Sequence, residues 1–244
     1  MVNNSQRLYN RDVAILKQYG KRYKLQLHRS LRNSGLEVKE KRRIKGEYVH
    51  EEKLEASIIR TRSKIYELAI CNDWDFFVTL TLDKRKYDRM DLKRYRVNLA
   101  QFIRDYNKKY KINIKYLLIP EMHKDKAWHM HGFIMGLPLE HLKKNENGYL
   151  DWFAYRNKFG YISIDEIRNK EAASCYILKY ITKNLENCVK ELNDHMYYCS
   201  QGLKRAEVIK RGMLKERNVK WEFENEWVKI KWLKENENIE DFIY

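Results

Sequence analysis

Two histidines two residues apart are the clearest sign of chemistry in this sequence. His129 and His131 flank Met130 within the stretch AWHMHGFIMG, whose composition favours a β-strand. Because side chains on a strand alternate between its faces, both imidazoles project from the same face. Two neutral imidazoles side by side make half of a divalent-metal site.

A carboxylate precedes this pair at a useful distance. Glu121 ends the β-rich stretch INIKYLLIPE, and residues 124–126 make a polar turn before the histidines. If the two strands pair across that turn, Glu121 lies beside His129 and His131. Two imidazoles and one carboxylate predict a Mn²⁺ or Mg²⁺ site, and Mn²⁺ tolerates nitrogen ligands better. His123 in the turn competes for the same role, and two surface histidines without a metal are the alternative.

Two tyrosines four residues apart form the second reactive set. The stretch CYILKYITKNLE carries Tyr176 and Tyr180, each followed three residues later by a lysine, Lys179 and Lys183. Positions four apart lie one turn apart on the same helix face. A tyrosine can attack a phosphodiester if a nearby cation helps its hydroxyl lose a proton. An ordinary amphipathic packing stripe is the alternative.

The charge of the chain favours a polyanionic partner. Lys and Arg number 50 against 34 Asp and Glu, which gives a formal net charge of +16 in 244 residues. The 18 tyrosines are often interleaved with cations, a pattern that suits base stacking together with phosphate contacts. A solvated basic surface is the competing interpretation. No apolar run approaches ~20 residues and no secretory signal is visible, so we expect a cytoplasmic protein without a membrane partner.

The order of the expected elements predicts an α+β fold with a central, mostly antiparallel sheet and flanking helices. Helices are expected over 51–69, 91–108 and about 166–187, the last capped by Ser163 or Asp165. Strands are expected over 75–83, 112–121 (stopping at Pro120), 129–135 and 161–164, with a hairpin over 221–232. Residues 1–50 are interpreted as a basic arm with marginal helices that grips duplex DNA, 51–204 as the main domain, and 205–244 as an extension packed on that domain.

Together these motifs resemble the HUH endonucleases, in which a hydrophobic residue separates two histidines. The similarity is greatest to the rolling-circle replication initiators of plasmids and single-stranded DNA phages. FFVTLTLD resembles the family's first motif, WHMHGFI its metal-binding motif and YILKYITK its nucleophile motif, and YYCSQGLKR is similar to a segment further downstream. The resemblance covers about residues 74–204 and implies an HUH fold, related to the RRM fold, with the nucleophile on a helix.

The resemblance also implies an activity and site residues. It implies nicking and rejoining of single-stranded origin DNA through a 5′-phosphotyrosine, with both tyrosines serving as in the two-tyrosine phage initiators. The implied metal ligands are Glu121, His129 and His131. The implied catalytic residues are Tyr176, Tyr180, Lys179 and Lys183, and the implied DNA contacts are Thr79, Thr81, Lys84 and Arg85.

Other interpretations remain open beside this one. The sequence has no GxxxxGK[ST] loop, so a host helicase and DNA polymerase are expected partners. A transposase or relaxase of the same fold is the nearest alternative, although relaxases usually place the nucleophile near the N-terminus. A DNA-binding regulator that does not cut is the alternative from another class. Cys188, His195 and Cys199 also form a weak candidate zinc cluster.

Overall fold

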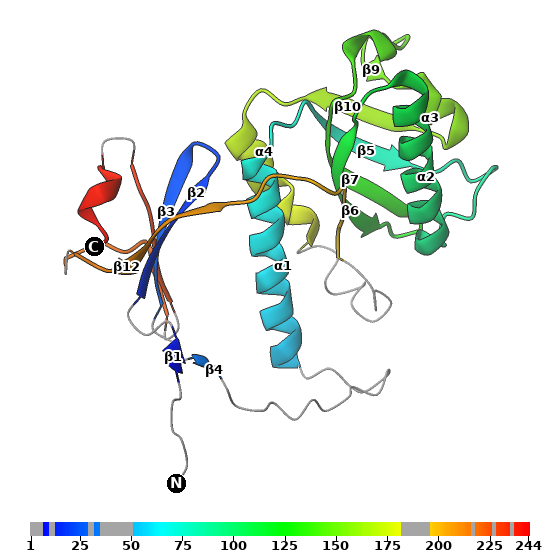
Figure 1. Ribbon diagram of the computed structural model, residues 1–244. Coiled ribbons are helices and arrows are strands. Elements are labelled where there is room, and N and C mark those ends of the chain that lie inside the picture. Colours follow the sequence, from blue (N-terminus) through cyan, green and yellow to red (C-terminus); the bar gives the residue numbers. More distant parts are fainter. Residues whose placement is uncertain are drawn as a thin grey trace. The chain divides into compact units, whose positions relative to one another are not determined.

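The computed structural model describes residues 13–28, 51–181, 196–215, 218–225, 228–234 and 237–244, with only the backbone for 51–57 and 239. It also gives the backbone of two short paired strands, β1 (Arg7–Tyr9) and β4 (Arg32–Ser34). The contacts divide the chain into two units. The first unit combines Met1–Leu54 with Arg205–Tyr244, and the second is Glu55–Lys204. Figure 1 shows the elements of both units.

The second unit is built on a five-stranded antiparallel sheet. Its strand order is β10-β5-β7-β6-β11, and every neighbouring pair is antiparallel. The strands are β5 (Phe76–Thr81), β6 (Lys115–Met122), β7 (Trp128–Met135), β10 (Ile162–Glu166) and β11 (Tyr198–Cys199). This architecture confirms the predicted α+β class and the mostly antiparallel sheet.

One face of this sheet packs on α2 (Leu92–Tyr110). Asp91 caps the helix, because its side chain accepts a hydrogen bond from the backbone N–H of Arg94. Along β5, buried and partly exposed residues alternate, and Val78 and Leu80 join the core under α2. The short α3 (Phe153–Lys158), the 3₁₀ turn η1 (Leu139–His141) and the strand pair β8 (Lys143–Lys144) and β9 (Leu150–Asp151) complete this side of the unit.

The opposite face of the sheet carries α1 (Glu51–Cys71) and α4 (Lys170–Tyr176), which lie across the sheet from α2 (Figure 1). Ile65 and Leu68 of α1 and Ile177 after α4 pack on this face. Leu117 and Phe133 are the sheet residues that they cover. This second core holds the end of α4 against β6 and β7, the strands on which Glu121 and the histidines lie.

Two local predictions in this unit were wrong. Pro120 lies inside β6 rather than ending it, because β11 pairs only with Leu117 and Leu118 and so leaves β6 an edge strand at Pro120. The helix predicted from Glu166 begins later, at Lys170. Asn169 caps it by accepting a hydrogen bond from the backbone N–H of Ala172, and neither Ser163 nor Asp165 acts as the cap.

The first unit contains a second five-stranded antiparallel sheet, of order β12-β2-β3-β14-β13. Its strands are β2 (Val13–Tyr19), β3 (Arg22–His28), β12 (Glu207–Met213), β13 (Phe223–Glu224) and β14 (Val228–Trp232). The 3₁₀ turn η2 (Ile239–Asp241) adds to the same unit. The predicted C-terminal hairpin is present, since β13 pairs with β14.

The N-terminal segment differs from the predicted arm. Residues 13–28 form a hairpin instead of marginal helices, and Gly20 takes a φ of +61° in the two-residue turn. Apolar and polar residues alternate along both strands, a period-2 pattern that the surrounding charges obscured. The structure also pairs β14 with β3, so residues 205–244 share a sheet with N-terminal residues rather than packing on the 51–204 domain. The basic run 39–45 lies outside the described residues.

In the described part of the chain, none of the helices combines the length and the apolar character needed to cross a membrane.

Candidate active site

Strand register brings the three predicted metal ligands to one place. Glu121 lies opposite His129 in the pairing of β6 with β7, and Ile119 lies opposite His131. The strands approach closely beside His131, because a Cβ on Gly132 would lie 2.0 Å from the backbone oxygen of Leu117. The predicted strand pairing across the polar turn is therefore confirmed, and both histidines project from the face that carries α4.

Glu121 and His131 are in direct contact. The Nε2 atom of His131 lies 2.7 Å from Oε2 of Glu121, and both side chains are less than a tenth exposed. Burial lowers the pKa of His131 to about 4 and outweighs the attraction of the Glu121 carboxylate. The imidazole is therefore neutral at pH 7, which is the form that binds metal ions.

Two threonines on β5 position the histidine rings. Thr79 lies opposite His131 and its Oγ1 is 3.1 Å from Nδ1 of that ring, while Oγ1 of Thr81 is 3.0 Å from Nδ1 of His129. A hydroxyl that accepts the Nδ1 proton leaves the Nε2 lone pair for a metal. The sequence assigned these threonines to DNA contact or sheet support, and their position behind the histidines gives them a second role that spacing alone does not reveal.

Tyr180 lies directly on the buried histidine. Its ring stacks on that of His131 with centroids 4.1 Å apart and planes 11° apart. The hydroxyl oxygens of Tyr176 and Tyr180 are 3.0 Å apart, and Tyr176 is 43% exposed. Both phenols therefore lie beside the Glu121–His131 pair, and Tyr176 is open to a ligand from solvent.

Phe77 is a member of the site that sequence reasoning missed. Its ring lies 5.4 Å from that of Tyr176 and 6.2 Å from that of Tyr180. Alternation along β5 places Phe77 on the same face as Thr79 and Thr81, so the strand pattern carried the signal. Contact with the tyrosines depends on how α4 packs, which no local pattern specifies.

The two predicted catalytic lysines differ in what the structure describes. The Lys179 ammonium lies 4.9 Å from the ring centroid of Tyr176. Lys183 lies outside the described residues, as do Cys188 and His195 of the candidate zinc cluster. Burial, together with the hydrogen bond and charge of Tyr176, raises the pKa of Tyr180 well above its ordinary value. Tyr180 is therefore protonated at neutral pH in the absence of a nearby cation.

The donor set fits a hard divalent ion in part. The 2.7 Å contact between Glu121 and His131 is close to the spacing of roughly 3 Å between neighbouring ligands of an octahedral Mg²⁺. The rings of His129 and His131 are nearly parallel with centroids 6.4 Å apart, and His123 stacks on His129 at 4.0 Å. Among the described residues, no three His, Cys, Asp or Glu side chains already converge as a metal cage. Rotation of the His129 side chain would be needed to complete the set.

Comparison with known proteins places this cluster in a family. The model of a family described as replication-associated protein ORF2 matches residues 75–185, a segment that includes the metal-ligand candidates and both tyrosines. Residues 75–185 belong to this replication-associated family. The match agrees with the resemblance of the three motifs to rolling-circle replication initiators. No curated protein and no solved structure matches the chain.

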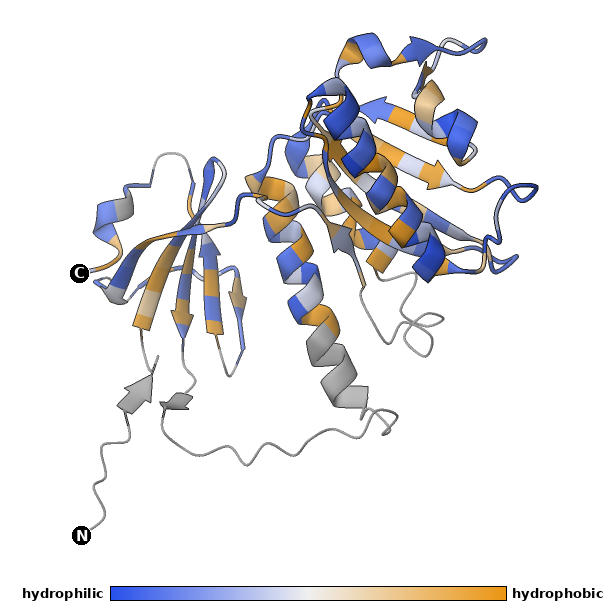
Figure 2. Ribbon diagram, turned by 45° about the vertical axis from the view of Figure 1, so that its right-hand side comes forward, coloured by the Kyte–Doolittle hydropathy of each residue, from blue (hydrophilic) through white to orange (hydrophobic). Residues whose placement is uncertain are grey.

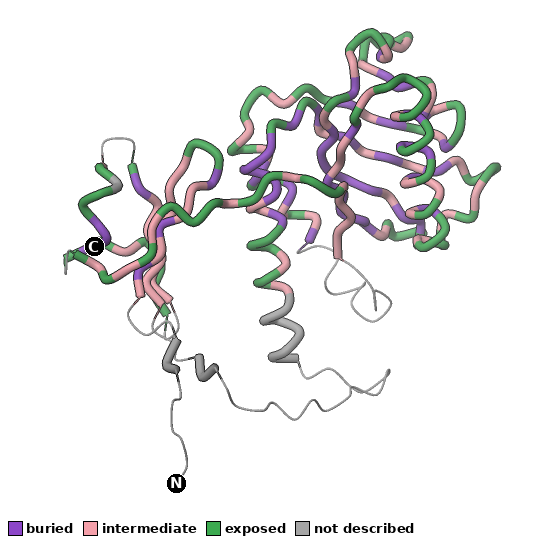
Figure 3. The backbone as a smooth tube through the Cα atoms, viewed as in Figure 1, coloured by how far each residue is buried: buried purple, intermediate pink, exposed green. Residues whose placement is uncertain are grey.

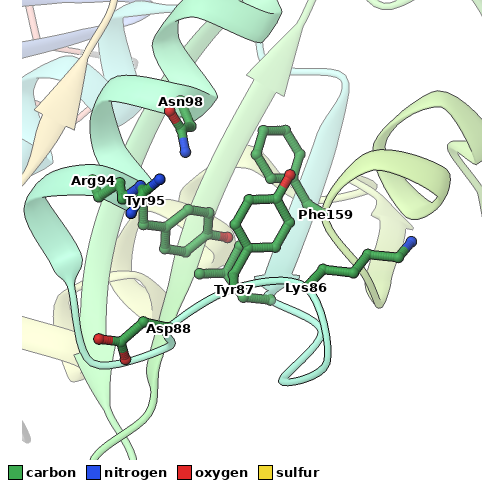
Figure 4. Close-up of a pocket in the computed structure, with 8 residues that line it drawn as sticks. Lys86, Tyr87, Asp88, Arg94, Tyr95, Asn98 and Phe159 are labelled. Carbon is green, nitrogen blue, oxygen red and sulfur yellow. The ribbon is translucent and has the colours of Figure 1, made fainter.

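The predicted DNA-contact residues Lys84 and Arg85 of the replication-associated domain lie in the loop after β5. Both are exposed, and Arg85 forms an ion pair of 2.9 Å with Asp83. The guanidinium of Arg85 lowers the pKa of Asp83 to about 2. The same loop borders a pocket on the α2 side of the domain (Figure 4). The pocket is lined by Leu82, Lys86, Tyr87, Asp88, Arg94, Tyr95, Asn98 and Phe159, and it shares no residue with the tyrosine site.

Protonation of His131 should make the stability of the metal-free domain depend on pH. The folded-state pKa of about 4 is below the ordinary value of 6.5, so the unfolded chain takes up the proton first as the pH falls. The stabilisation is therefore complete above pH 6.5 and is lost as the pH falls through 4, by up to about 3 kcal/mol. Urea unfolding in EDTA between these pH values measures it. A His131→Gln variant should show a shallower dependence, and an equally steep one would contradict the assignment.

Proposed function

We propose that the replication-associated domain nicks and rejoins single-stranded DNA at a rolling-circle origin through a 5′-phosphotyrosine. One observation carries the proposal: Tyr180 stacks on His131, which contacts Glu121, and Tyr180 in turn meets the hydroxyl of Tyr176. Two candidate nucleophiles thus lie against two candidate metal ligands. The family match supports a role in replication, and the arrangement of side chains supports the chemistry.

A divalent ion would complete the site. Glu121, His129 and His131 would hold Mn²⁺ or Mg²⁺, which supplies positive charge beside the scissile phosphate and its leaving oxygen. Thr79 and Thr81 would fix the orientation of the imidazoles through their Nδ1 atoms. Because the buried His131 is neutral, it does not need to lose a proton before it binds the ion.

The reaction is a transesterification. The phenolic oxygen of Tyr176 or Tyr180 loses its proton and attacks the phosphorus in line with the bond to the 3′-oxygen. A P–O bond to tyrosine forms as the P–O3′ bond breaks, and the departing oxygen takes up a proton to become a free 3′-hydroxyl. The phosphotyrosine retains an ester bond, so attack by a 3′-hydroxyl reverses the step and rejoins strands without ATP.

The hydrogen bond between the phenols gives the two tyrosines different starting states. Tyr180 has a raised pKa, whereas Tyr176 is more exposed and lies under the Lys179 ammonium. If Tyr180 donates to Tyr176, the oxygen of Tyr176 is the better placed to become the phenolate. We therefore propose that Tyr176 attacks first, and that Tyr180 supports it or attacks in a second round. Lys179 and Lys183 would position the phosphate.

The rest of the function follows from the resemblance. Lys84 and Arg85 would contact DNA beside the nick, a host helicase and DNA polymerase would extend the 3′-hydroxyl, and the protein would act in the cytoplasm. A transposase or relaxase of the same fold is a second endonuclease interpretation, and its substrate would be a transposon end or transfer origin.

Covalent trapping tests the proposal. Labelled single-stranded DNA from a rolling-circle origin is incubated with the full chain and Mn²⁺, and the products are resolved under denaturing conditions. We expect a labelled adduct that protease converts to a short peptide–DNA conjugate. Retarded DNA that stays intact and forms no adduct would instead favour a DNA-binding regulator without nuclease activity.

A further inference from the structure

The sheet of the first unit has one face without a hydrophobic core. Ala14, Leu16 and Leu25 pack on its core face with Phe242 and Ile243. The residues that alternate with them make the opposite face, which we call the open face. Most of its described residues are only partly exposed or exposed, whereas the strands of the other sheet are largely buried (Figure 3).

The open face gathers cations and aromatic rings. In the strand register, Lys17 lies opposite Lys24, Tyr19 opposite Arg22, and Trp232 opposite Lys24. Arg211 lies opposite Ile15 on the neighbouring strand β12 and adds a fourth cation to the same face. No Asp or Glu stands at any described strand position of this face. Along these strands, hydrophobic and hydrophilic residues alternate (Figure 2).

The aromatic rings hold two of the cations in place over the sheet. The Arg22 guanidinium lies 4.7 Å from the Trp232 ring centroid, and the Lys24 ammonium lies 5.3 Å from it. Lys24 also lies 5.6 Å from the ring of Tyr19, which meets Trp232 edge to face at 5.2 Å. Cation–π contacts of this kind fix the charged heads and leave the positive charge intact.

The core face of the same sheet shows the opposite use of charge. Lys229 forms an ion pair with Glu224 at 2.7 Å, and Lys231 forms one with Glu237. These carboxylates lie with the core-face lysines. The sheet therefore separates its charges, with mixed signs on the core face and only positive side chains on the strand positions of the open face.

We propose that the open face is a second binding surface for single-stranded DNA, distinct from the tyrosine site. The phosphates would lie against Lys17, Arg22, Lys24 and Arg211, and unpaired bases would stack on Phe223, which is 51% exposed on the edge strand β13. An unpaired strand fits better than a duplex, because only unpaired bases offer their faces to an aromatic ring. This surface is built from both ends of the sequence and lies outside the segment that the family model matches.

Salt-dependent binding tests the open face. A fluorescent single-stranded DNA of mixed sequence is titrated with the full chain in EDTA, so that no cleavage is involved. In Arg22→Gln/Lys24→Gln, the slope of log K against log[salt] should fall in magnitude by about 1.4, and binding at 0.1 M salt should weaken about 25-fold. Phe223→Ala should weaken binding about 5-fold or more without changing the slope.

A matched variant separates this surface from general charge. Lys220→Gln/Lys234→Gln removes two exposed lysines of the same unit and should leave both affinity and slope close to wild type. Unfolding curves of all variants establish that the fold is kept. An unchanged slope in Arg22→Gln/Lys24→Gln would overturn the proposal, and so would a loss confined to duplex DNA. Because adduct formation is not measured, failure of the nicking proposal would leave this result intact.

Discussion

A Tyr176→Phe/Tyr180→Phe double variant should form no covalent adduct with origin DNA. Each substitution removes only a hydroxyl, and the aromatic contacts with Phe77 and His131 remain. Without a phenolic oxygen beside Glu121 and His131, no nucleophile is left, and the rate of nicking should fall on the order of 10⁴-fold or more. Denaturing gels of labelled DNA after incubation with Mn²⁺ measure this loss.

The single variants assign the roles of the two phenols. Tyr176→Phe should lose most of the first cleavage, because it removes the more exposed oxygen and the hydrogen-bond partner of Tyr180. Tyr180→Phe should retain single cleavage at a reduced rate and lose steps that need a second nucleophile. Peptide mapping of the adduct identifies the attacking residue in each case.

A remote tyrosine provides the control. Tyr149 is 68% exposed in the β8–β9 turn, and Tyr149→Phe should nick at the wild-type rate. DNA binding measured in EDTA should stay within about twofold of wild type for all these variants, since phosphate contacts by cations provide most of the affinity. Persistent adduct in the double variant would show that another residue attacks.

The strand-borne half of the site could be predicted from the sequence, because it depends on local geometry. Alternation along a strand put His129 and His131 on one face, and a turn of hairpin length put Glu121 beside them. The same alternation put Thr79 and Thr81 on one face of β5. A strand pattern specifies faces and registers with few free choices.

The helix-borne half could not be predicted in the same way. The spacing of Tyr176 and Tyr180 indicated a shared helix face, but their contact with His131 depends on packing by Ile177 and Ile181 against the sheet. That packing is tertiary and leaves no periodic signal beyond an amphipathic stripe. The likeness to known motifs, rather than spacing, was the basis for assigning the tyrosines to the site.

The N-terminal hairpin shows a different cause of error. Val13 to Tyr19 and Arg22 to His28 alternate as strands should, yet Lys17, Arg22 and Lys24 give the segment the composition of a basic arm. The partners of this hairpin, β12 and β14, lie about 200 residues further along the chain. Local patterns reveal no sheet for such strands to join, and composition then outweighs periodicity.

A Glu121→Gln variant should lose the metal. The amide matches the carboxylate in shape and can still meet Nε2 of His131, so the fold is kept, but it lacks the negative charge that a divalent ion requires. At a Mn²⁺ concentration about 100 times its dissociation constant, binding stabilises the wild type by about 2.7 kcal/mol, or roughly 5–10 °C in Tm. In Glu121→Gln this Mn²⁺-dependent shift should vanish, and nicking should fall by about 10²–10³-fold.

Thermal unfolding with and without Mn²⁺ measures that loss apart from activity, and Glu140→Gln is the matched control. Glu140 is an exposed glutamate of η1, so its substitution removes the same charge away from the histidines. It should keep the full Mn²⁺ shift and the wild-type rate of nicking. A full shift in Glu121→Gln would place the metal elsewhere in the protein. Equal loss in both variants would point to the overall charge of the chain, because only a specific site distinguishes a buried carboxylate beside His131 from one in solvent.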